Sequence, residues 1–379
     1  MAKVMIFGDF KTNQSHLLNL SNELTQHLKS SDINVVNFEA PVNSSGKPIS
    51  KSGPNISQNI KSADWLIKHN FTAISLANNH IMDFGIEGLI ATKKQFSNIT
   101  TMGAGTWNDA YRCHIFIAND GIKIGIICCT HCEFGTLTDS FSQQNDFGCA
   151  WVLNTQIQNL ISTHKNEVDC LIVLPHGGIE YMEQPLPEWR EVYKMFIDLG
   201  ADAVIASHPH IPQGWEIYKN KPICYSLGNF CFEWSKDKYV PPKHWFESLC
   251  CNLEISTSHH INIEIIPIFF NQDEKYIYRN TTNEFANYLK RINKTLKNDN
   301  EYIMYVNNYV KDIFPFYIQQ FTRSGWNANI LSKGFLKGLA EGFLGRGFFK
   351  LDHAINNIQC ESHRWAILRE INNRKRELL

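Results

Sequence analysis

The chain has 379 residues, enough for one large domain with an appendage or for two domains. Its hydrophobic fraction of 43% provides for a sizeable core and excludes wholesale disorder. With 36 basic and 37 acidic residues the formal net charge is −1, so no nucleic-acid partner is expected.

The first ten residues, MAKVMIFGDF, contain an apolar run that is too short for a signal peptide and predicts a buried strand. The sequence has no run of about 18 apolar residues, which is the length that a transmembrane helix requires. These two features predict a cytoplasmic protein.

Short apolar runs alternate with amphipathic stretches along the first 230 residues. The apolar runs predict strands at 4–10, 34–41, 71–77, 123–129, 169–176, 201–210 and 222–230. The amphipathic stretches predict helices at 14–30, 62–70, 85–97 and 186–200, the last of which ends at Gly200. Alternation of strands and helices is typical of an α/β domain.

The pattern changes after residue 270. Apolar residues at helical spacing predict one helix over 283–314 and a final helix over 364–378. Between them lies a glycine-rich apolar piece, GFLKGLAEGFLGRGFF, at 334–349. We expect a main domain at 1–270 and a helical extension at 271–379. The glycine-rich piece is expected to pack as a helix against the main domain, with peripheral membrane contact as the alternative.

The eleven cysteines lie mostly in apolar runs, which favours buried reduced thiols. Cys129 and Cys132 form one C-x-x-C pair, and His131 lies inside it. A structural zinc site usually needs a second pair at suitable spacing, and none follows.

Polar side chains occur where the predicted strands end. These residues are Asp9, Glu39, Asn79, His80, His176, His208 and His210. Ligand sites in open α/β sheets lie outside the carboxyl ends of strands, so these side chains are expected to share one crevice. Carboxylates, imidazoles and amide oxygens suit divalent metals. Each residue taken alone has a plainer interpretation, as a turn residue, a solvated loop carboxylate or a buried histidine.

The spacing of the two histidines in HPH bears on this site. On a strand, His208 and His210 would face the same way. On a sharp turn favoured by Pro209, their directions would diverge and reach different metals.

A longer pattern carries a family resemblance. The order GD, NFEAP, SLANNHIMDFGIEGL, GAG, LPHGGIEY and HPHIPQGWEIYKNKPICYSLGNF resembles the CapA family of bacterial capsule and poly-γ-glutamate biosynthesis proteins. The resemblance runs from about residue 3 to 270. It implies the calcineurin-like metallophosphoesterase fold, a four-layer α-β-β-α sandwich with two metals at the strand ends.

The resemblance also implies a role for each residue. It makes Asp9 and His210 ligands of the first metal, Glu39 the bridging ligand, Asn79, His176 and His208 ligands of the second metal, and His80 the residue that meets the phosphate. Two positions depart from the related patterns. The wider superfamily begins with D-x-H, where this chain has Lys11, and many relatives have tryptophan after the histidine at 176.

The resulting hypothesis is metal-dependent hydrolysis of a phosphate ester, with a phosphorylated small molecule or glycan intermediate as substrate. Two divalent ions are expected, Mn²⁺ first and Fe²⁺ or Zn²⁺ as alternatives. Asp83 either orients His80 or caps the helix that follows. Glu180 and Tyr181 either contact substrate or pack at a sheet edge.

The alternative hypothesis is a non-hydrolytic, metal-binding assembly factor that docks to a membrane or to capsule-synthesis proteins. A third activity, ATP-dependent ligation on glutamyl polymers, is disfavoured, because the sequence lacks the phosphate-binding pattern G-x-x-x-x-G-K-[ST].

Overall fold

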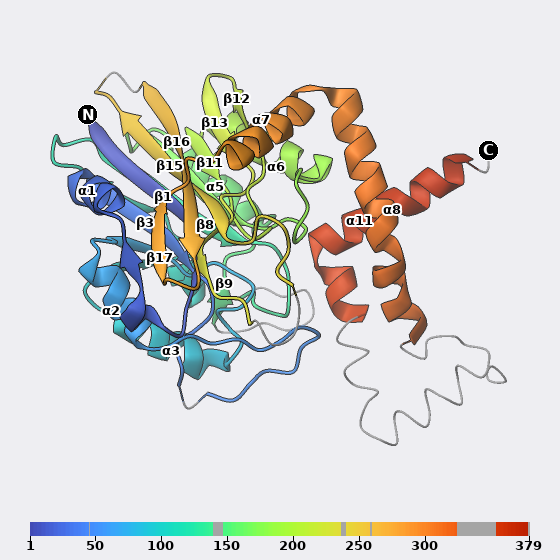
Figure 1. Ribbon diagram of the computed structural model, residues 1–379, viewed down its shortest axis with the longest axis horizontal. Helices are drawn as coiled ribbons and strands as arrows, with labels where there is room; N and C mark the ends of the chain where they lie inside the picture. Colours follow the sequence, from blue (N-terminus) through green and yellow to red (C-terminus); the bar gives the residue numbers. More distant parts are fainter. Residues whose placement is uncertain (45, 139–146, 236–239, 258–259, 324–353, 378–379) are drawn as a thin grey trace.

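The computed structural model describes residues 1–44, 46–138, 147–235, 240–257, 260–323 and 354–377. Two β-sheets lie face to face at the centre, and helices cover their outer faces (Figure 1). This arrangement confirms the expected α/β class and the four-layer α-β-β-α sandwich.

The first sheet is built around the N-terminal strand β1 (Ala2–Lys11). Its strands follow in the order β2 (Asn19–Leu20), β17 (Tyr276–Arg279), β16 (Ile261–Asn271), β15 (Glu247–Ile255), β1, β3 (Ile33–Phe38), β4 (Ala73–Ser75) and β5 (Thr100–Met102), while β14 (Asn229–Phe232) also pairs with β1. From β1 to β5 all pairs are parallel, and β15 is antiparallel to β1.

The second sheet has a parallel centre. Its order is β12 (Trp215–Tyr218), β13 (Lys221–Cys224), β11 (Ala203–Ile205), β10 (Cys170–His176), β8 (Lys123–Thr130) and β7 (His114–Ile117). The four strands β13, β11, β10 and β8 run parallel, and β12 and β7 close the edges in antiparallel pairs. A small separate pair joins β6 (Ala104–Gly105) to β9 (Gly148–Cys149).

The alternation of side chains along β1 explains the layers. Val4 and Ile6 pack between the two sheets, whereas Met5 and Phe7 belong to the cluster under the outer helices. That outer cluster includes apolar residues of α1 (Asn22–Ser30), α2 (Lys61–Lys68) and α3 (Gly85–Gln95).

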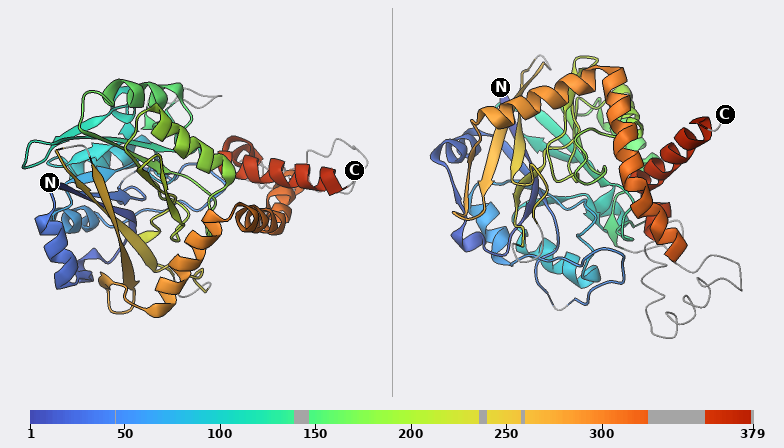
Figure 2. Two further views of the ribbon diagram at one scale, coloured as in Figure 1. Left: turned by 90° about the horizontal axis from the view of Figure 1, so that it is seen from above. Right: turned by 45° about the vertical axis from the view of Figure 1, so that its right-hand side comes forward.

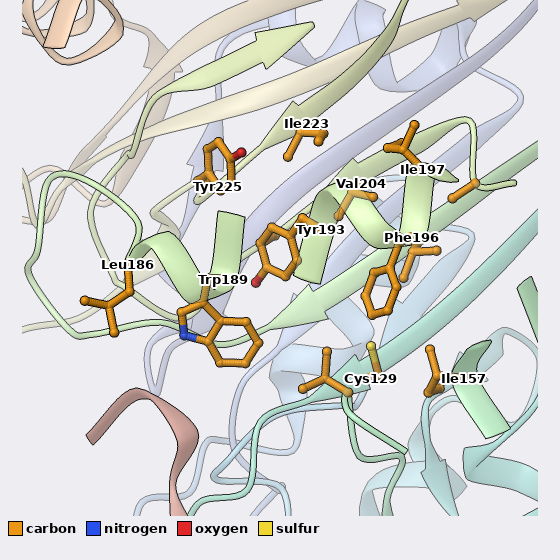
Figure 3. Close-up of a cluster of buried hydrophobic side chains, with 14 of the residues drawn as sticks. Cys129, Ile157, Leu186, Trp189, Tyr193, Phe196, Ile197, Val204, Ile223 and Tyr225 are labelled. Carbon is orange, nitrogen blue, oxygen red and sulfur yellow. The ribbon is translucent and has the colours of Figure 1, made fainter. Parts of the chain in front are cut away.

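The opposite outer face is covered by α5 (Thr155–His164) and α6 (Pro187–Leu199). Figure 3 shows Trp189, Tyr193 and Phe196 of α6 directed onto the second sheet. Fully buried aromatic side chains of this size contribute much of the burial energy of such a layer.

The C-terminal helices pack onto the same clusters. Phe285 and Ile292 of α7 (Asn283–Lys297) join the core between the sheets, and Val306 of α8 (Asp299–Arg323) joins the cluster under α6. Trp365 of α11 (Glu361–Glu377) packs on Trp189, with ring centroids 4.9 Å apart. Figure 2 shows α8 and α11 projecting together from one side of the sandwich.

Several predicted helices are confirmed, among them α2, α3 and α6. Gly200 ends α6 with a φ of 125°, a conformation that glycine adopts readily. The helix predicted at 14–30 is wrong in its first half, because residues 19–20 pair with β17 as an edge strand. Ser21 then caps α1 by accepting a hydrogen bond from the Leu24 amide.

Other predicted elements also differ from the structure. The strand predicted at 222–230 is two strands, β13 and β14, which lie in different sheets. The helix predicted at 283–314 divides at Asn298 into α7 and α8. Strands β15 and β16 and helix α5 were not predicted. The glycine-rich piece at 334–349 lies outside the described residues.

The structure also bears on the expectations for the cysteines and for membrane-spanning helices. All eleven cysteines are buried and free, which confirms the interpretation as reduced thiols. Within the described ranges, no helix has both the length and the apolar character needed to cross a bilayer.

Candidate functional site

The carboxyl ends of parallel strands from both sheets meet at one edge of the sandwich. Strands β1, β3 and β4 contribute from the first sheet, and β10 and β11 contribute from the second. The side chains in the last residues of these strands or in the loops just after them are Asp9, Asn37, Glu39, Asn79, His80, His176, His208 and His210, and all of them are buried. The structure therefore brings the predicted metal ligands into one cluster.

A bulge in β1 positions Asp9. The pairing of β1 with β3 changes register between Phe7 and Asp9. A Cβ atom on Gly8 would lie 1.8 Å from the carbonyl oxygen of Gly228, so this close approach requires glycine. Beyond the bulge, the Asp9 amide donates to that carbonyl at 3.0 Å, and Asn37 donates to Asp9 Oδ1 at 2.7 Å.

Asp9, Glu39 and His210 form one candidate ligand set. His210 Nδ1 lies 3.5 Å from Asp9 Oδ2, and His210 Nε2 lies 3.6 Å from Glu39 Oε1. One ligand atom from each of the three residues lies within 4.8 Å of the others. Neither Glu39 oxygen has a hydrogen-bond partner among the residues that the structure describes, although both oxygens are buried.

The protonation of this set reflects its burial. Burial opposes the charged form of Asp9, but contacts with His210, His176 and Asn37 together outweigh it and lower the pKa of Asp9. Burial also disfavours the charged form of His210, yet Glu39 and Asp9 raise the pKa of His210 to about 10. Burial, and then the charge of Asp9, raise the pKa of Glu39 well above its ordinary value. Glu39 therefore needs a proton or a bound cation for neutralisation.

Asn79, His176 and His208 form the second candidate set. His176 Nε2 lies 3.1 Å from Asn79 Oδ1 and 3.2 Å from His208 Nδ1. Burial lowers the pKa of His176 to about 3 and that of His208 well below its usual value. Both imidazoles are therefore neutral near pH 7, the form in which histidine binds metal.

The HPH turn separates its two histidines. His208 and His210 both have positive φ values, 101° and 61°, on either side of Pro209. The His208 ring packs on His176, with centroids 4.9 Å apart, whereas His210 Nδ1 lies 3.0 Å from Asn229 Oδ1. The divergence expected from this turn is thus present, and each histidine belongs to a different ligand set.

His80 is held by Asp83. His80 Nδ1 lies 2.7 Å from Asp83 Oδ2, and α3 has no side-chain cap at its N-terminus. Of the two interpretations of Asp83, orientation of His80 therefore fits the structure and helix capping does not. Lys51, which is also buried, forms an ion pair with Asp83. Burial, then the charge of Lys51, lower the pKa of His80.

Asn78 fixes the turn that carries these residues. Its Nδ2 donates to Asn37 Oδ1 at 3.1 Å and to the Phe38 carbonyl at 3.0 Å. Its Oδ1 accepts from the His80 amide at 3.2 Å. The loop after β4 is therefore tied to β3, beside Glu39.

Glu180 and Tyr181 lie beside the histidines in the loop after β10. The Tyr181 amide donates to the Pro209 carbonyl at 2.9 Å, and the rings of Tyr181 and His210 lie 6.3 Å apart. Both residues line a cavity. This placement leaves substrate contact as a proposal for both.

Sequence reasoning did not find His131 and Glu133 as part of this site. Asn79 Nδ2 donates to Glu133 Oε2 at 2.8 Å, and His131 Nε2 lies 3.2 Å from the same oxygen. Because its nitrogen faces Glu133, the Asn79 amide directs its oxygen to His176. Their place in the sequence could have indicated this role. His131 and Glu133 come directly after β8, which pairs in parallel with β10, so they lie at the same sheet edge as His176.

The C-terminal segment also reaches this site, which the sequence did not predict. The His363 ring lies 3.7 Å from Glu133 Oε1, and Ser362 Oγ lies 3.3 Å from His131 Nδ1. Glu133 forms two further groups with ligand atoms within 4.8 Å, one with His131 and His208 and one with Cys360 and His363. Contacts across more than 200 residues leave no periodic signal in a single sequence.

The chain is similar in sequence to two curated bacterial proteins. It is 30% identical over 223 residues to the capsule biosynthesis protein CapA of Bacillus anthracis, covering 57% of this chain and 54% of that protein. It is 30% identical over 226 residues to the PGA biosynthesis protein CapA of Bacillus subtilis strain 168, covering 55% and 56%. The chain thus spans about half the length of the curated relatives it matches.

Among solved structures, a putative 5′-nucleotidase from Staphylococcus aureus aligns with a TM-score of 0.44 and 14% identity, over 77% of this chain and 58% of that chain. The model of the bacterial capsule synthesis protein PGA_cap family matches residues 6–233, which include every residue of the two ligand sets. The chain belongs to the bacterial capsule synthesis protein PGA_cap family.

Proposed function

We propose that the protein is a metal-dependent phosphoester hydrolase that acts in the synthesis of a capsular polysaccharide or a poly-γ-glutamate-like polymer. The observation that carries this proposal is the buried carboxylate of Glu39, which lacks a hydrogen-bond donor among the described residues and lies beside Asp9 and His210. The names of the relatives, which include capsule and PGA biosynthesis proteins, support the pathway.

The donor sets fit two divalent cations. Asp9, Glu39 and His210 would hold one, and Asn79, His176 and His208 would hold the other. The mixture of carboxylate, amide and imidazole donors suits Mn²⁺ first, with Fe²⁺ or Zn²⁺ as alternatives. Bound divalent ions would supply positive charge to the phosphoryl group and to the attacking water.

His80 would act on the oxygen of the leaving group. Asp83 occupies Nδ1, so Nε2 is the nitrogen available to a substrate. The negative charge of a bound phosphate would raise the pKa of His80, and Asp83 would stabilise the imidazolium that results. His80 would then donate the Nε2 proton to the departing oxygen as a general acid.

The test compares wild type with His80→Ala, both loaded with Mn²⁺. The substrates are an aryl phosphate, sugar phosphates and nucleotide-linked sugars. We expect the variant to keep its metal content, measured by mass spectrometry, and to lose on the order of a hundredfold or more in kcat. If both fully metallated proteins are equally inert with every substrate, the hydrolase proposal is wrong.

A second candidate function is a non-hydrolytic, metal-binding assembly factor for the polymer machinery. One relative carries the name probable polyglutamine synthesis accessory protein, from Mycobacterium tuberculosis, at 28% identity over 165 residues. Its partners would be capsule-synthesis proteins or a membrane surface. A metallated, inert protein that binds vesicles or purified synthesis proteins only with its metal present would favour this function.

A further inference from the structure

A cavity of about 390 Å³ lies beside the two ligand sets. It is lined by parts of the loops 52–54, 133–134 and 179–181, by side chains of α8, and by residues of the segment 356–363. We call it the aromatic cavity. Its outer wall, α8 and the C-terminal segment, lies beyond the residues that match the family model.

The aromatic cavity reaches the site through three of its lining residues. Glu133 accepts a hydrogen bond from Asn79 at 2.8 Å. Phe134 packs near His80, with ring centroids 5.8 Å apart, and Tyr181 lies 6.3 Å from the His210 ring. A phosphate held at the ligand sets would therefore lie next to this cavity.

The outer wall is held in place by hydrogen bonds to the loops of the sandwich. The Tyr309 hydroxyl donates to the Glu180 carbonyl at 3.1 Å, and the Phe134 amide donates to Asn356 Oδ1 at 3.0 Å. The Cys132 amide donates to Glu361 Oε2 at 2.8 Å. A pocket wall fixed in this way is pre-formed for a ligand.

The chemistry of the lining limits what the cavity can bind. Phe134, Phe316 and Tyr317 supply aromatic surface, and Glu133 and Glu180 supply carboxylates. Ionised carboxylates only accept hydrogen bonds, so they match hydroxyl groups of a ligand. No described lining residue is lysine or arginine, and Lys51, whose Nζ lies 4.2 Å from the centroid of the Phe134 ring, is already paired with Asp83, so a ligand carboxylate would mainly meet like charge.

We propose that the aromatic cavity binds the alcohol part of the phosphoester, and that this part is an uncharged, hydroxylated ring such as a hexose. The inference rests on the proposed function and names its substrate class. One face of such a ring packs on the aromatic side chains, and its hydroxyls donate to the carboxylates. The volume is at the small end for ligand pockets and fits a small organic group.

The first test uses two phosphates that differ by one charge, a hexose 1-phosphate and the corresponding hexuronic acid 1-phosphate. We expect wild type to prefer the neutral sugar by at least about tenfold in kcat/KM, because like charges in a pocket repel. Glu180→Gln should reduce the ratio between the kcat/KM values for the two sugar phosphates. Glu183→Gln should preserve it, because Glu183 lies outside the cavity lining and pairs with Arg291.

The second test separates binding in the cavity from chemistry. Phe316→Ala should raise KM for the hexose phosphate several-fold and leave kcat and the KM for methyl phosphate unchanged. Met304→Ala is the control, because Met304 is an exposed residue of the same helix and does not line the cavity. Calorimetric titration with a methyl hexoside, which carries no phosphate, measures the cavity alone.

The outcomes distinguish this inference from the proposed function. Hydrolysis of methyl phosphate without any preference between the two sugars would overturn the cavity assignment and keep the hydrolase. A stronger preference for an aminohexose phosphate or a nucleoside monophosphate would overturn the uncharged-hexose assignment. An inert protein that still binds the hexoside, and loses that binding with Phe316→Ala, would support the cavity and overturn the hydrolase. A protein that neither hydrolyses a phosphate ester nor binds the hexoside would overturn both the hydrolase proposal and the cavity assignment.

Discussion

Glu39 shows at the scale of a single residue why a cation is proposed at this site. A buried carboxylate without a donor is costly, and this cost falls when the group is protonated or lies against positive charge. Asp9 and His210 are its neighbours, and His210 is the group that can carry a proton up to about pH 10. In the metal-free protein, protons therefore stand in for the charge that a metal would supply.

This substitution of protons predicts a maximum of stability near pH 6.5 without metal. The pKa of His210 is raised from 6.5 to about 10, so its contribution is complete below pH 6.5 and is lost as pH rises toward 10. The pKa of His176 is lowered from 6.5 to about 3, so its contribution is complete above pH 6.5 and is lost as pH falls toward 3. Melting temperatures in EDTA should fall on both sides.

Mn²⁺ should flatten the alkaline side of this curve, because metal affinity grows as His210 loses its proton. His210→Gln should weaken the alkaline decline in EDTA and leave the part that comes from the raised pKa of Glu39. Circular dichroism melts across about pH 5 to 9 measure both effects. A metal-free wild type whose melting temperature rises steadily to pH 9 would contradict the assignment of charge to His210.

At the scale of elements, the N-terminal turn of α11 makes hydrogen bonds to the loop after β8 and to its surroundings. Glu361 is fully buried and accepts from the Cys132 amide and from the Trp151 indole. Ser362 accepts from the Trp189 indole at 2.9 Å. The N-terminal turn of α11 thus holds the loop that presents Glu133 to Asn79.

Glu361→Ala should lower the free energy of unfolding by about 1 to 3 kcal/mol, because one buried and one partly buried donor lose this acceptor. It should also raise KM, since the loop around Glu133 loses support. Urea unfolding and steady-state kinetics measure the two effects. Leu368→Ala is the matched control on the same helix, and its half-exposed side chain should cost about 0.5 kcal/mol or less. Equal effects of the two substitutions would show that Glu361 has no special role.

At the scale of the whole molecule, eleven buried cysteines report on the integrity of the sandwich. They are distributed over both sheets and the C-terminal segment. Burial raises the pKa of several of these thiols, for example that of Cys113 to about 12, which suppresses the reactive thiolate.

The native protein should therefore react with a thiol reagent at pH 8 only as fast as it opens, and all eleven thiols should react at once in denaturant. With an aromatic disulfide as the reagent, the absorbance of the aromatic thiol that is released counts the cysteines that have reacted. Rapid reaction of several thiols without denaturant would contradict the burial described for the sandwich.

The same scale shows which features a single sequence can predict. The strand ends that carry Asp9, His176 and His208 follow strongly apolar runs, so their convergence could be foreseen from the rule for parallel sheets. Strands β15 and β16 were missed because their surroundings lack the helix–strand alternation. Residues 222–230 appeared as one strand because local pattern contains no information on which sheet a residue joins. His363 contacts Glu133 across 230 positions of the chain, and such a contact leaves no local pattern in the sequence.

That distance along the chain has a consequence for biosynthesis. The loop at 131–133 makes hydrogen bonds with residues 361–362, which follow it by about 230 positions, so these bonds form only after that segment has been synthesised. At a translation rate of about 5 to 20 residues per second, a nascent chain waits roughly 12 to 46 s between the two. Strand β1 likewise waits for β15, its antiparallel partner. The emerging polypeptide therefore passes through a long interval in which the histidines of the two candidate ligand sets exist but their surroundings are incomplete, so the proposed metal binding would come late, after the ribosome has supplied the C-terminal helices.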